Sequence, residues 1–517
     1  MTCRPAAPME PQRDTIEFLS APHAHGGAPV ERVDTHASIV FLAGETAYKL
    51  KRAVRYDYLD FSTPERRKAM CEAELSINRR TAPQIYERVV PVTREAPGAL
   101  AIDGTGTPVD WLLVMRRFDQ SQLLDRLAAS GGLALDTMTA LGHGIERMHG
   151  GAEHCAARGG AASMAWVVEG NARDFTAHPS LDGGLAAELT ERARAALAVH
   201  GARLDDRQAR GLVRRCHGDL HLRNIVLLDG APTPFDAVEF NDDISCIDVL
   251  YDLAFLLMDL WRRSLRAHAN AVFNAYVGAA GLIDGLALLP LFLSCRAAVR
   301  AKTGATAAAL EHDPLKRREL EQTAAGYLAL ARQLLEPPPA RLVAVGGLSG
   351  TGKSSLAHRI APAVGAAPGA LIVRSDELRK HQAGVPLDSP LPSDSYTAEA
   401  SARVYESLVR TAEQAIAQGH SVIADAVFSA AWERDAIQGA ARRAGVTFLG
   451  LWLEAPPEVC IHRVANRRGD VSDADAGVVR AQFARETGAI SWVRLDASGG
   501  TGGIAQTALE LLGTESR

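Results

Sequence analysis

The sequence predicts two domains of different fold class: an α+β domain with two lobes, followed by an α/β domain with a mostly parallel sheet. Three observations lead to this prediction. At 517 residues the chain is too long for one hydrophobic core. Consecutive prolines at 337–339 cannot continue a helix and stiffen the chain, as a linker between domains does. Strand-type and helix-type segments follow one another in different orders on the two sides of these prolines.

The segment 30–335 is expected to form the first domain. Its strand-type runs lie at 38–42, 47–51 and 111–115, and long helical patterns follow them. This order predicts a small sheet lobe on a larger helical lobe. The residues before it, 1–29, are rich in Pro, Ala, Gly and His and are expected to be a flexible tail.

After a proline-rich linker at 336–341, the segment 342–517 is expected to form the second domain. Short apolar runs alternate there with helical patterns, which indicates an α/β fold with parallel strands. The expected strands lie at 342–345, 371–373, 422–424, 448–453 and 492–495. No internal repeat is evident, so the two domains are different folds and not a duplication.

The composition excludes several classes of protein. Hydrophobic residues make up 47% and charged residues 23% of the chain, and the net charge of −5 does not suggest a polyanionic partner. No window reaches the roughly 18 apolar residues of a membrane span. The N-terminus lacks the apolar core of a secretory signal, so a cytoplasmic protein is expected. The seven cysteines are scattered and predict neither disulfides nor a zinc module.

The clearest motif runs from Gly347 to Ser354 and reads GLSGTGKS, which fits the pattern GxxxxGK[ST]. It directly follows an expected strand and opens an expected helix. In such a loop, backbone N–H groups and the positive helix end hold phosphate oxygens. We therefore expect Lys353 to reach the β and γ phosphates of ATP and the Ser354 hydroxyl to bind Mg²⁺. The other residues expected to bind the nucleotide are Gly347, Ser349, Gly350, Thr351, Gly352 and Ser355.

Polar residues after the next expected strands complete a candidate phosphotransfer site. Asp376 could orient a substrate hydroxyl and Arg379 could hold an anionic group, the alternative being a capping Asp on a solvated helix. Asp425 ends the third strand, where a carboxylate suits a magnesium-bound water. Arg463 and Arg467 are candidates for a lid that neutralises the transferred phosphoryl group, or for an exposed basic face.

On these residues, the segment from 342 onward resembles the P-loop small-molecule kinases. That group includes the gluconate, shikimate and adenylylsulfate kinases, with zeta toxins and polynucleotide kinases as more distant members. The resemblance implies ATP, Mg²⁺ and phosphoryl transfer, but not the acceptor. Nucleic acid is not the expected partner of this segment, because a nucleic-acid groove normally shows an excess of basic residues. From 342 onward, acidic and basic residues nearly balance, and the segment contains only two lysines, Lys353 and Lys380.

A second constellation lies in the first domain. His217, Gly218 and Asp219 precede Asn224 by a few residues, and Asp236 follows after an apolar flank. Transfer to a hydroxyl needs a carboxylate beside the nucleophile and oxygen ligands for Mg²⁺. These residues resemble the aminoglycoside phosphotransferase and choline kinase family, which is related to protein kinases. The resemblance implies a protein-kinase-like bilobal fold, Asp219 as catalytic base, Asn224 and Asp236 as magnesium ligands, and a structural role for His217.

Upstream, Lys49 is similar to the family's strand lysine that holds the α and β phosphates, and Glu74 on the following helix is its expected ion-pair partner. Lys51, two residues along the same strand, and Glu72 on the same helix are the alternatives. The sequence departs from protein kinases in one respect. No GxGxxG loop lies between the first two strands, where Gly44-Glu45 makes only a short turn.

Further acidic residues of the first domain allow more than one interpretation. Aminoglycosides are polycations, so a resistance enzyme should present a strongly acidic acceptor pocket. Glu239, Asp242 and Asp243 hint at acidity, but they could equally support the metal ligands and cap helices. Asp252 could cap a helix or brace the catalytic loop.

We therefore expect a bifunctional ATP-dependent kinase, in which both domains transfer the γ-phosphate of ATP to small molecules. In one alternative, the P-loop domain is a polynucleotide 5′-kinase. In the other, the chain is an ATP-sensing regulator with one or both sites inactive. The complete set of Asp219, Asn224 and Asp236 counts against a first domain that only binds nucleotide. The sequence does not predict the acceptors, because the fold alone does not set them.

Overall fold

The computed structural model describes residues 12–35, 37–56, 59–466, 471–499 and 501–513. Its contacts divide the chain into two compact units. The first unit comprises Met1–Met164 and Gly201–Leu256, and the second comprises Ala165–His200 and Leu257–Arg517. The predicted combination of an α+β fold with an α/β fold is confirmed. None of the helices in these described ranges combines the length and apolar character that a membrane span needs.

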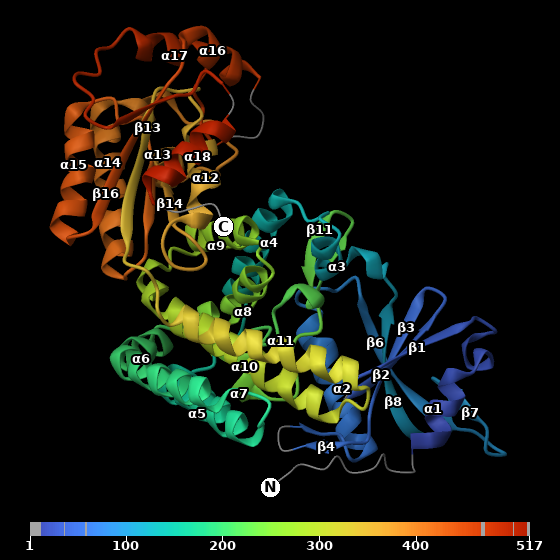
Figure 1. Ribbon diagram of the computed structural model, residues 1–517. Coiled ribbons are helices and arrows are strands. Elements are labelled where there is room, and N and C mark those ends of the chain that lie inside the picture. The colour runs from blue at the N-terminus through green and yellow to red at the C-terminus, as the bar shows by residue number, and fades with distance from the viewer. Residues whose placement is uncertain (1–11, 36, 57–58, 467–470, 500, 514–517) are drawn as a thin grey trace. The chain divides into compact units, whose positions relative to one another are not determined.

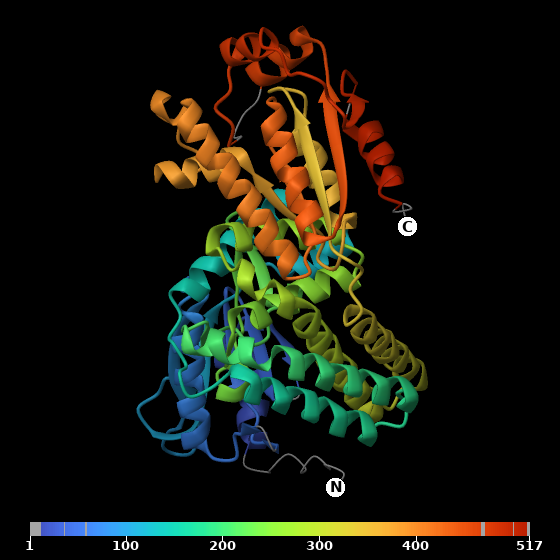
Figure 2. The ribbon, with the colours of Figure 1, turned by 90° about the vertical axis from the view of Figure 1, so that its left-hand side faces the viewer.

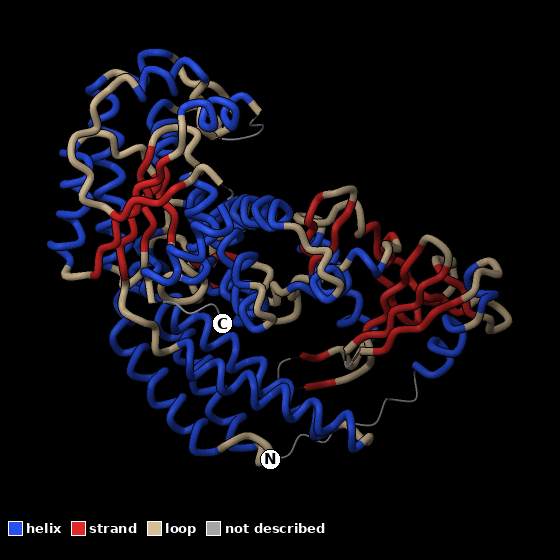
Figure 3. Tube along the Cα trace, turned by 45° about the horizontal axis from the view of Figure 1, so that its top comes forward, coloured by secondary structure: helices blue, strands red, loops and turns tan. Residues whose placement is uncertain are grey.

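The first unit contains a six-stranded antiparallel sheet with the order β1-β2-β3-β8-β6-β7, drawn as a twisted sheet in Figure 3. The strands are β1 (Val30–Asp34), β2 (Ser38–Ala43), β3 (Thr46–Lys51), β6 (Tyr86–Arg94), β7 (Leu100–Ile102) and β8 (Thr107–Arg116). Helix α2 (Pro64–Asn78) packs against β6 and β8. The three strands expected from the sequence correspond to β2, β3 and β8. Gly44 and Glu45 form the short turn between β2 and β3, with Gly44 at a φ of 56°.

The predicted flexible tail is wrong from Gln12 onward. Residues 13–20 form helix α1 (Arg13–Ser20), and Leu19 is fully buried against the sheet. The buried amide of Gln12 donates to the Lys51 carbonyl and to Asp110, both at 2.8 Å. Composition pointed to a tail, whereas burial of Leu19 and these long-range hydrogen bonds attach the segment to the fold. Residues 1–11 lie outside the described residues.

The rest of the first unit surrounds the second constellation. Strand β9 (Val213–Arg215) pairs with β12 (Cys246–Asp248), and β10 (Ile225–Leu228) pairs with β11 (Ala231–Pro234), both antiparallel. The remaining elements are β4 (Arg55–Tyr56), β5 (Leu59–Asp60), α3 (Leu124–Ala129), α4 (Leu135–Gly150) and α7 (Asp242–Ser245). Helices α5 (Gly160–Ala177), α6 (Gly183–Ala209) and α8 (Val249–Arg262) contain residues of both units.

The second unit contains a five-stranded parallel sheet with the order β14-β15-β13-β16-β17. Its strands are β13 (Arg341–Gly347), β14 (Leu371–Arg374), β15 (Val422–Asp425), β16 (Thr447–Glu454) and β17 (Val493–Asp496). All five strands expected from the sequence are present. Helices α14 (Ala398–Ala417) and α15 (Ala431–Ala444) cover one face, and α12 (Lys353–Ile360) with α18 (Thr501–Leu511) covers the other (Figures 1 and 2). Three further α-helices follow β13 in the sequence: α13 (Ser375–Ala383), α16 (Pro457–Ala465) and α17 (Ala476–Phe483).

Helices that precede the prolines belong to this second unit as well. They are α9 (Arg266–Ala280), α10 (Leu289–Leu310) and α11 (Pro314–Leu334). Two asparagines of α9 bind backbone groups at edge strand β14. Asn270 donates to the carbonyl of Ala370, directly before the strand, at 3.0 Å, and Asn274 accepts from the Ile372 N–H at 2.7 Å. An edge strand exposes unpaired backbone groups, and α9 satisfies them here. The boundary between the two compact units therefore does not coincide with the predicted linker 336–341.

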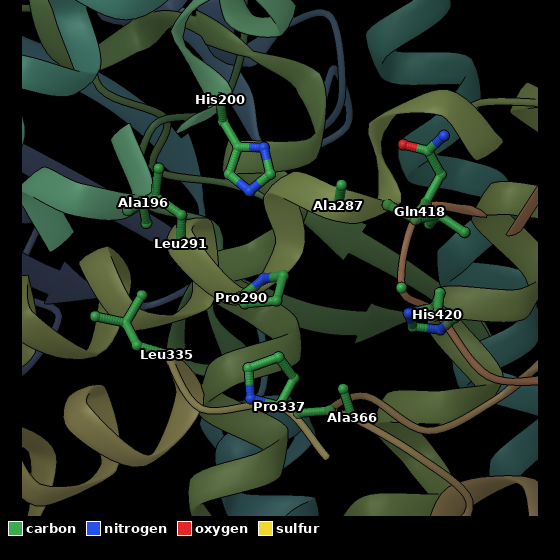
Figure 4. A pocket seen from close by; sticks show the side chains of 13 residues that line it. Ala196, His200, Ala287, Pro290, Leu291, Leu335, Pro337, Ala366, Gln418 and His420 are labelled. Atoms are coloured by element: carbon green, nitrogen blue, oxygen red, sulfur yellow. The ribbon is translucent and has the colours of Figure 1, made fainter. Parts of the chain in front are cut away.

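A cavity of 240 Å³ lies within the second unit (Figure 4). It is bounded by residues that precede β14, such as Ala366, and by residues that precede β15, such as His420. These residues mark the amino ends of the parallel strands. The phosphate loop follows β13 at the carboxyl ends, where ligands bind in folds of this kind, so the cavity is not part of that site.

We expect His420 to make the stability of the second unit depend on pH. Its ring donates to the Gly369 carbonyl at 3.0 Å, and burial lowers its pKa from 6.5 to about 4. Between these two values the unfolded chain binds a proton that the folded chain does not bind. Lowering the pH through this window therefore reduces the free energy of unfolding, by at most about 1.4 kcal/mol per pH unit.

Urea unfolding at about pH 7, 6 and 5 checks this prediction. The variant His420→Gln should lose that part of the pH dependence. The control His381→Gln changes an exposed histidine and should keep the wild-type slope. Identical slopes in wild type and His420→Gln would contradict the assignment.

Candidate active sites

The residues 217–224, here called the catalytic loop, connect β9 to β10 in the first unit. The buried carboxylate of Asp252, in the first turn of α8, accepts the backbone N–H of His217 at 3.1 Å and of Gly218 at 2.8 Å. His149 donates its Nε2–H to the same carboxylate at 3.1 Å. Gly218 has a φ of 82°, a conformation that glycine adopts without strain. The sequence left open whether Asp252 caps a helix or braces the catalytic loop, and these hydrogen bonds show that it braces the loop.

Asp219 and Asn224, five residues apart in the catalytic loop, lie side by side. Asn224 donates from Nδ2 to Oδ2 of Asp219 at 2.9 Å and to the Asp219 carbonyl at 3.0 Å. His221 Nε2 lies 3.3 Å from the same carboxylate oxygen. The Asp219 side chain is 40% exposed, so a substrate hydroxyl could reach it. The loop thus orients a carboxylate that solvent still contacts.

His217 joins the catalytic loop to the segment of Asp236. Its Nε2–H donates to the Phe235 carbonyl at 2.8 Å, and its Nδ1 accepts the N–H of Asp219 at 3.3 Å. Accepting this N–H at Nδ1 requires a neutral ring, and burial lowers the pKa of His217 accordingly. Asp236 follows β11 with a φ of 61°, and its N–H donates to the Tyr86 hydroxyl at 3.0 Å. His217 therefore positions two of the carboxylates that the sequence singled out.

A network of ion pairs, buried except at Asp236, connects β3, α2 and the Asp236 segment. Lys49 lies 2.7 Å from Glu74 and 2.6 Å from Asp236. Lys51 lies 2.6 Å from Glu74 and 2.5 Å from Glu239. Glu74 thus pairs with both lysines at once, one on each carboxylate oxygen. Only Lys49 of the two pairs with Asp236, so the geometry favours Lys49 as the lysine nearest the phosphates.

The structure also distinguishes Glu74 from Glu72. Glu74 is fully buried, whereas the Glu72 side chain is 57% exposed and lies 3.8 Å from Lys68. Burial opposes ionisation of Glu74, but the two lysine ammonium groups outweigh it and hold its pKa at about 2. Glu74 is therefore ionised at neutral pH. The sequence could not separate the two glutamates, because both lie on the same helix two residues apart.

In the second unit, the residues 347–354 form a phosphate loop between β13 and α12, as predicted. Gly350 has a φ of 85°, and a Cβ there would lie 2.5 Å from the Cys460 carbonyl oxygen. Only glycine fits this position. Lys353 donates to the Leu348 carbonyl at 3.1 Å, which folds its side chain back over the loop. Ser349 donates its N–H to Gln482 of α17 at 2.8 Å.

Two side-chain oxygens meet at the carboxyl ends of the strands. Ser354 donates its hydroxyl to Oδ2 of Asp425 at 2.6 Å. Asp425 ends β15 and is the register partner of Val345 on β13, which leads into the loop. This sheet register explains why residues 71 positions apart meet.

Arg374 is a residue of this site that sequence reasoning missed. It donates from its NH2 group to the Ser354 hydroxyl at 3.1 Å, and its Nε lies 3.4 Å from Oδ2 of Asp425. Its NH1 group lies 3.1 Å from Glu377. The available signal was its place directly after an expected strand, where site residues of α/β folds gather.

The arginines predicted to bind substrate have other contacts. Arg379 donates from NH1 to the Ser395 carbonyl at 2.6 Å, and its guanidinium lies over the Tyr396 ring. Arg463 donates to the Gly499 carbonyl at 2.8 Å. Both therefore hold loops of the protein in this structure. Arg467 lies outside the described residues. Asp376 is the second residue of α13. The pKa of Tyr396 is raised mainly by burial, next by Asp473, and to a smaller extent by the charge of Asp376.

Both sites fit a nucleotide with Mg²⁺. Mg²⁺ takes oxygen ligands, and the two sites offer carboxylate, amide and hydroxyl oxygens that their hydrogen bonds hold in place. The first site would hold the ion with Asn224 and Asp236, and the second with Ser354 and Asp425. A hydroxyl and a carboxylate oxygen only 2.6 Å apart can share one cation.

Comparison with known families agrees with this geometry. Residues 51–289 match the family model described as the phosphotransferase enzyme family. Residues 342–488 match the family model described as an AAA domain. The two matches support a phosphotransferase with kinase-type activity. The predicted resemblances of both domains and the prediction of an ATP-dependent kinase are thereby confirmed.

Similar proteins cover most of the chain, whereas similar solved structures cover parts of it. An uncharacterised protein of Mycobacterium tuberculosis is 28% identical over 479 residues, which cover 90% of this chain and 92% of that protein. A choline/ethanolamine kinase family protein from Mesorhizobium loti is 16% identical, covering 63% of this chain and 95% of its own with a TM-score of 0.38. The Mycobacterium tuberculosis APS kinase is 23% identical, covering 34% of this chain and 99% of its own with a TM-score of 0.24.

We expect Glu74→Gln to destabilise the first unit and to weaken its binding of ATP. The change leaves Lys49 and Lys51 buried with one counter-charge fewer, which typically costs about 3–5 kcal/mol of unfolding free energy. Urea unfolding and calorimetric titration with ATP measure the two effects. Glu72→Gln is the matched control on the exposed side of the same helix, with an expected change within about 0.5 kcal/mol. Equal effects of both variants would refute the assignment of Glu74.

Proposed function

We propose that both sites transfer the γ-phosphoryl group of ATP to hydroxyl groups of small molecules. The supporting observations are contacts among the residues proposed for this reaction. In the first site Lys49 pairs with Asp236 and Asn224 donates to Asp219, and in the second Ser354 donates to Asp425 next to the phosphate loop that carries Lys353. When bound, Mg²⁺ would neutralise phosphate charge at either site.

In the first site, Asp219 is proposed as the catalytic base. Its exposed carboxylate would orient the acceptor hydroxyl and take its proton, while the hydrogen bond from Asn224 holds the carboxylate in place. Lys49 would bind the α and β phosphates, and its ion pair with Glu74 would hold the ammonium group in place. Because Lys49 also contacts Asp236, the phosphate-binding lysine and the metal-binding carboxylate are positioned together.

In the second site, Lys353 and the backbone of the phosphate loop would bind the β and γ phosphates. Asp376, at the start of α13, is proposed to orient the acceptor hydroxyl. Ser354 and Asp425 would hold the cation. Roles for Arg379 and Arg463 in acceptor binding require them to leave the carbonyl groups that they contact.

The contacts of the first unit do not favour a polycationic acceptor. The acidic residues that hinted at one are paired with cations of the protein: Glu239 with Lys51, Asp242 with Arg215, and Asp243 with Arg158. Their charge is therefore largely neutralised within the unit. We propose an uncharged or anionic hydroxyl compound as the acceptor of the first site.

A single substitution in each site distinguishes the two proposed transfer reactions. Purified protein is incubated with Mg²⁺, γ-labelled ATP and fractions of a metabolite extract. Asp219→Ala should reduce labelling of one acceptor by at least roughly a hundredfold, because it removes the base, and should leave the other acceptor labelled. Lys353→Ala should give the converse result.

The control Lys316→Ala removes an exposed lysine of α11 and should label both acceptors as wild type does. If no fraction is labelled although both sites bind ATP, the transfer proposal fails and an ATP-sensing regulator is supported. Labelling of DNA or RNA ends that Lys353→Ala abolishes would instead support a polynucleotide kinase.

A further inference from the structure

The guanidinium of Arg374 lies between three oxygen-bearing side chains. On one side it contacts Ser354 at 3.1 Å and Asp425 at 3.4 Å, and on the other it contacts Glu377 at 3.1 Å. Its side chain is only 10% exposed. Arg374 ends β14, and Asp425 is its register partner on the adjacent parallel strand β15. The sheet itself therefore directs this positive charge toward the two oxygens.

The same two oxygens are the proposed ligands of the cation. Oγ of Ser354 and Oδ2 of Asp425 are 2.6 Å apart, and the guanidinium donates to, or faces, each of them. A divalent ion bound to this pair would lie within a few ångströms of a fixed positive charge. At that distance, in a site with little exposure to water, the repulsion is substantial. The guanidinium and the ion cannot both keep their best contacts with these oxygens.

We propose that Arg374 competes with the divalent cation for Ser354 and Asp425, so that metal binding is coupled to movement of the guanidinium toward Glu377. Arg374 is thus a positioning residue. It supplies the counter-charge that keeps the buried carboxylate of Asp425 beside Ser354, and it raises the metal concentration that the site needs. This inference rests on the proposed function of the phosphate loop.

Glu377 makes the inference specific. Its carboxylate lies on the same helix as Asp376 and holds the guanidinium from the side away from the phosphate loop. A stronger ion pair with Glu377 would favour movement of the Arg374 guanidinium away from Asp425. A weaker ion pair would favour its contact with Asp425. Arg374 and Glu377 should therefore shift the metal requirement in opposite directions.

The experiment measures how Mg²⁺ tightens binding of a fluorescent ATP analogue to the full-length chain. Every sample carries Asp236→Ala, so that the first site lacks a metal ligand. With Arg374→Ala, we expect the Mg²⁺ concentration for half-maximal tightening to fall by roughly fivefold. With Glu377→Gln, we expect it to rise. Arg359→Ala, which removes an exposed charge at the far end of α12, is the matched control and should not shift it.

The double variant Arg374→Ala/Glu377→Gln decides whether Glu377 acts through the arginine. We expect it to behave like Arg374→Ala alone, and an additive shift would refute the coupling. An unchanged or higher metal requirement in Arg374→Ala would overturn the proposal, while thermal unfolding confirms that the variants are folded. If wild type shows no ATP binding that Lys353→Ala abolishes, the proposed function of the phosphate loop fails instead.

Discussion

A carboxylate withdrawn from water must be matched by positive charges or hydrogen-bond donors, and this requirement organises both sites. In the first unit, fully buried Glu74 is matched by Lys49 and Lys51, which attach helix α2 to the central sheet. The same lysines reach the segment after β11 through Asp236 and Glu239. The lysines and carboxylates proposed to bind phosphate and metal in this unit thus share one electrostatic framework, and displacing one carboxylate would disturb the others.

The second unit meets the same requirement with different residues. Asp425 is buried at the end of β15, and its partners are the hydroxyl of Ser354 and the guanidinium of Arg374. The sheet beneath these groups depends in turn on α9, because Asn270 and Asn274 satisfy backbone groups at edge strand β14. The strand that carries Arg374 is therefore held by a helix that precedes the proline-rich segment. Helix α9 lies within the sequence range predicted for the first domain, yet it supports the second site.

Much of this protein could be predicted from local patterns. Strands β2, β3 and β8 and all five strands of the parallel sheet follow from apolar runs, because burial on a sheet demands such residues whatever the partner strand is. The phosphate loop was recognisable since its glycines, lysine and serine act within eight consecutive residues. The tail prediction was wrong because Gln12 and Leu19 are attached by partners far along the chain, Lys51 and Asp110 among them.

Local patterns predicted the two fold classes and the short segments proposed to carry phosphate chemistry, because these depend on residues close together in the chain. The folded chain was needed to show which glutamate pairs with the strand lysines, that Lys49 reaches Asp236, and that Arg374 faces the proposed metal ligands. Each of these contacts joins segments that sheet register or helix packing brings together. A helix places Glu72 and Glu74 on different faces, and only the position of the helix against the sheet makes one of them buried.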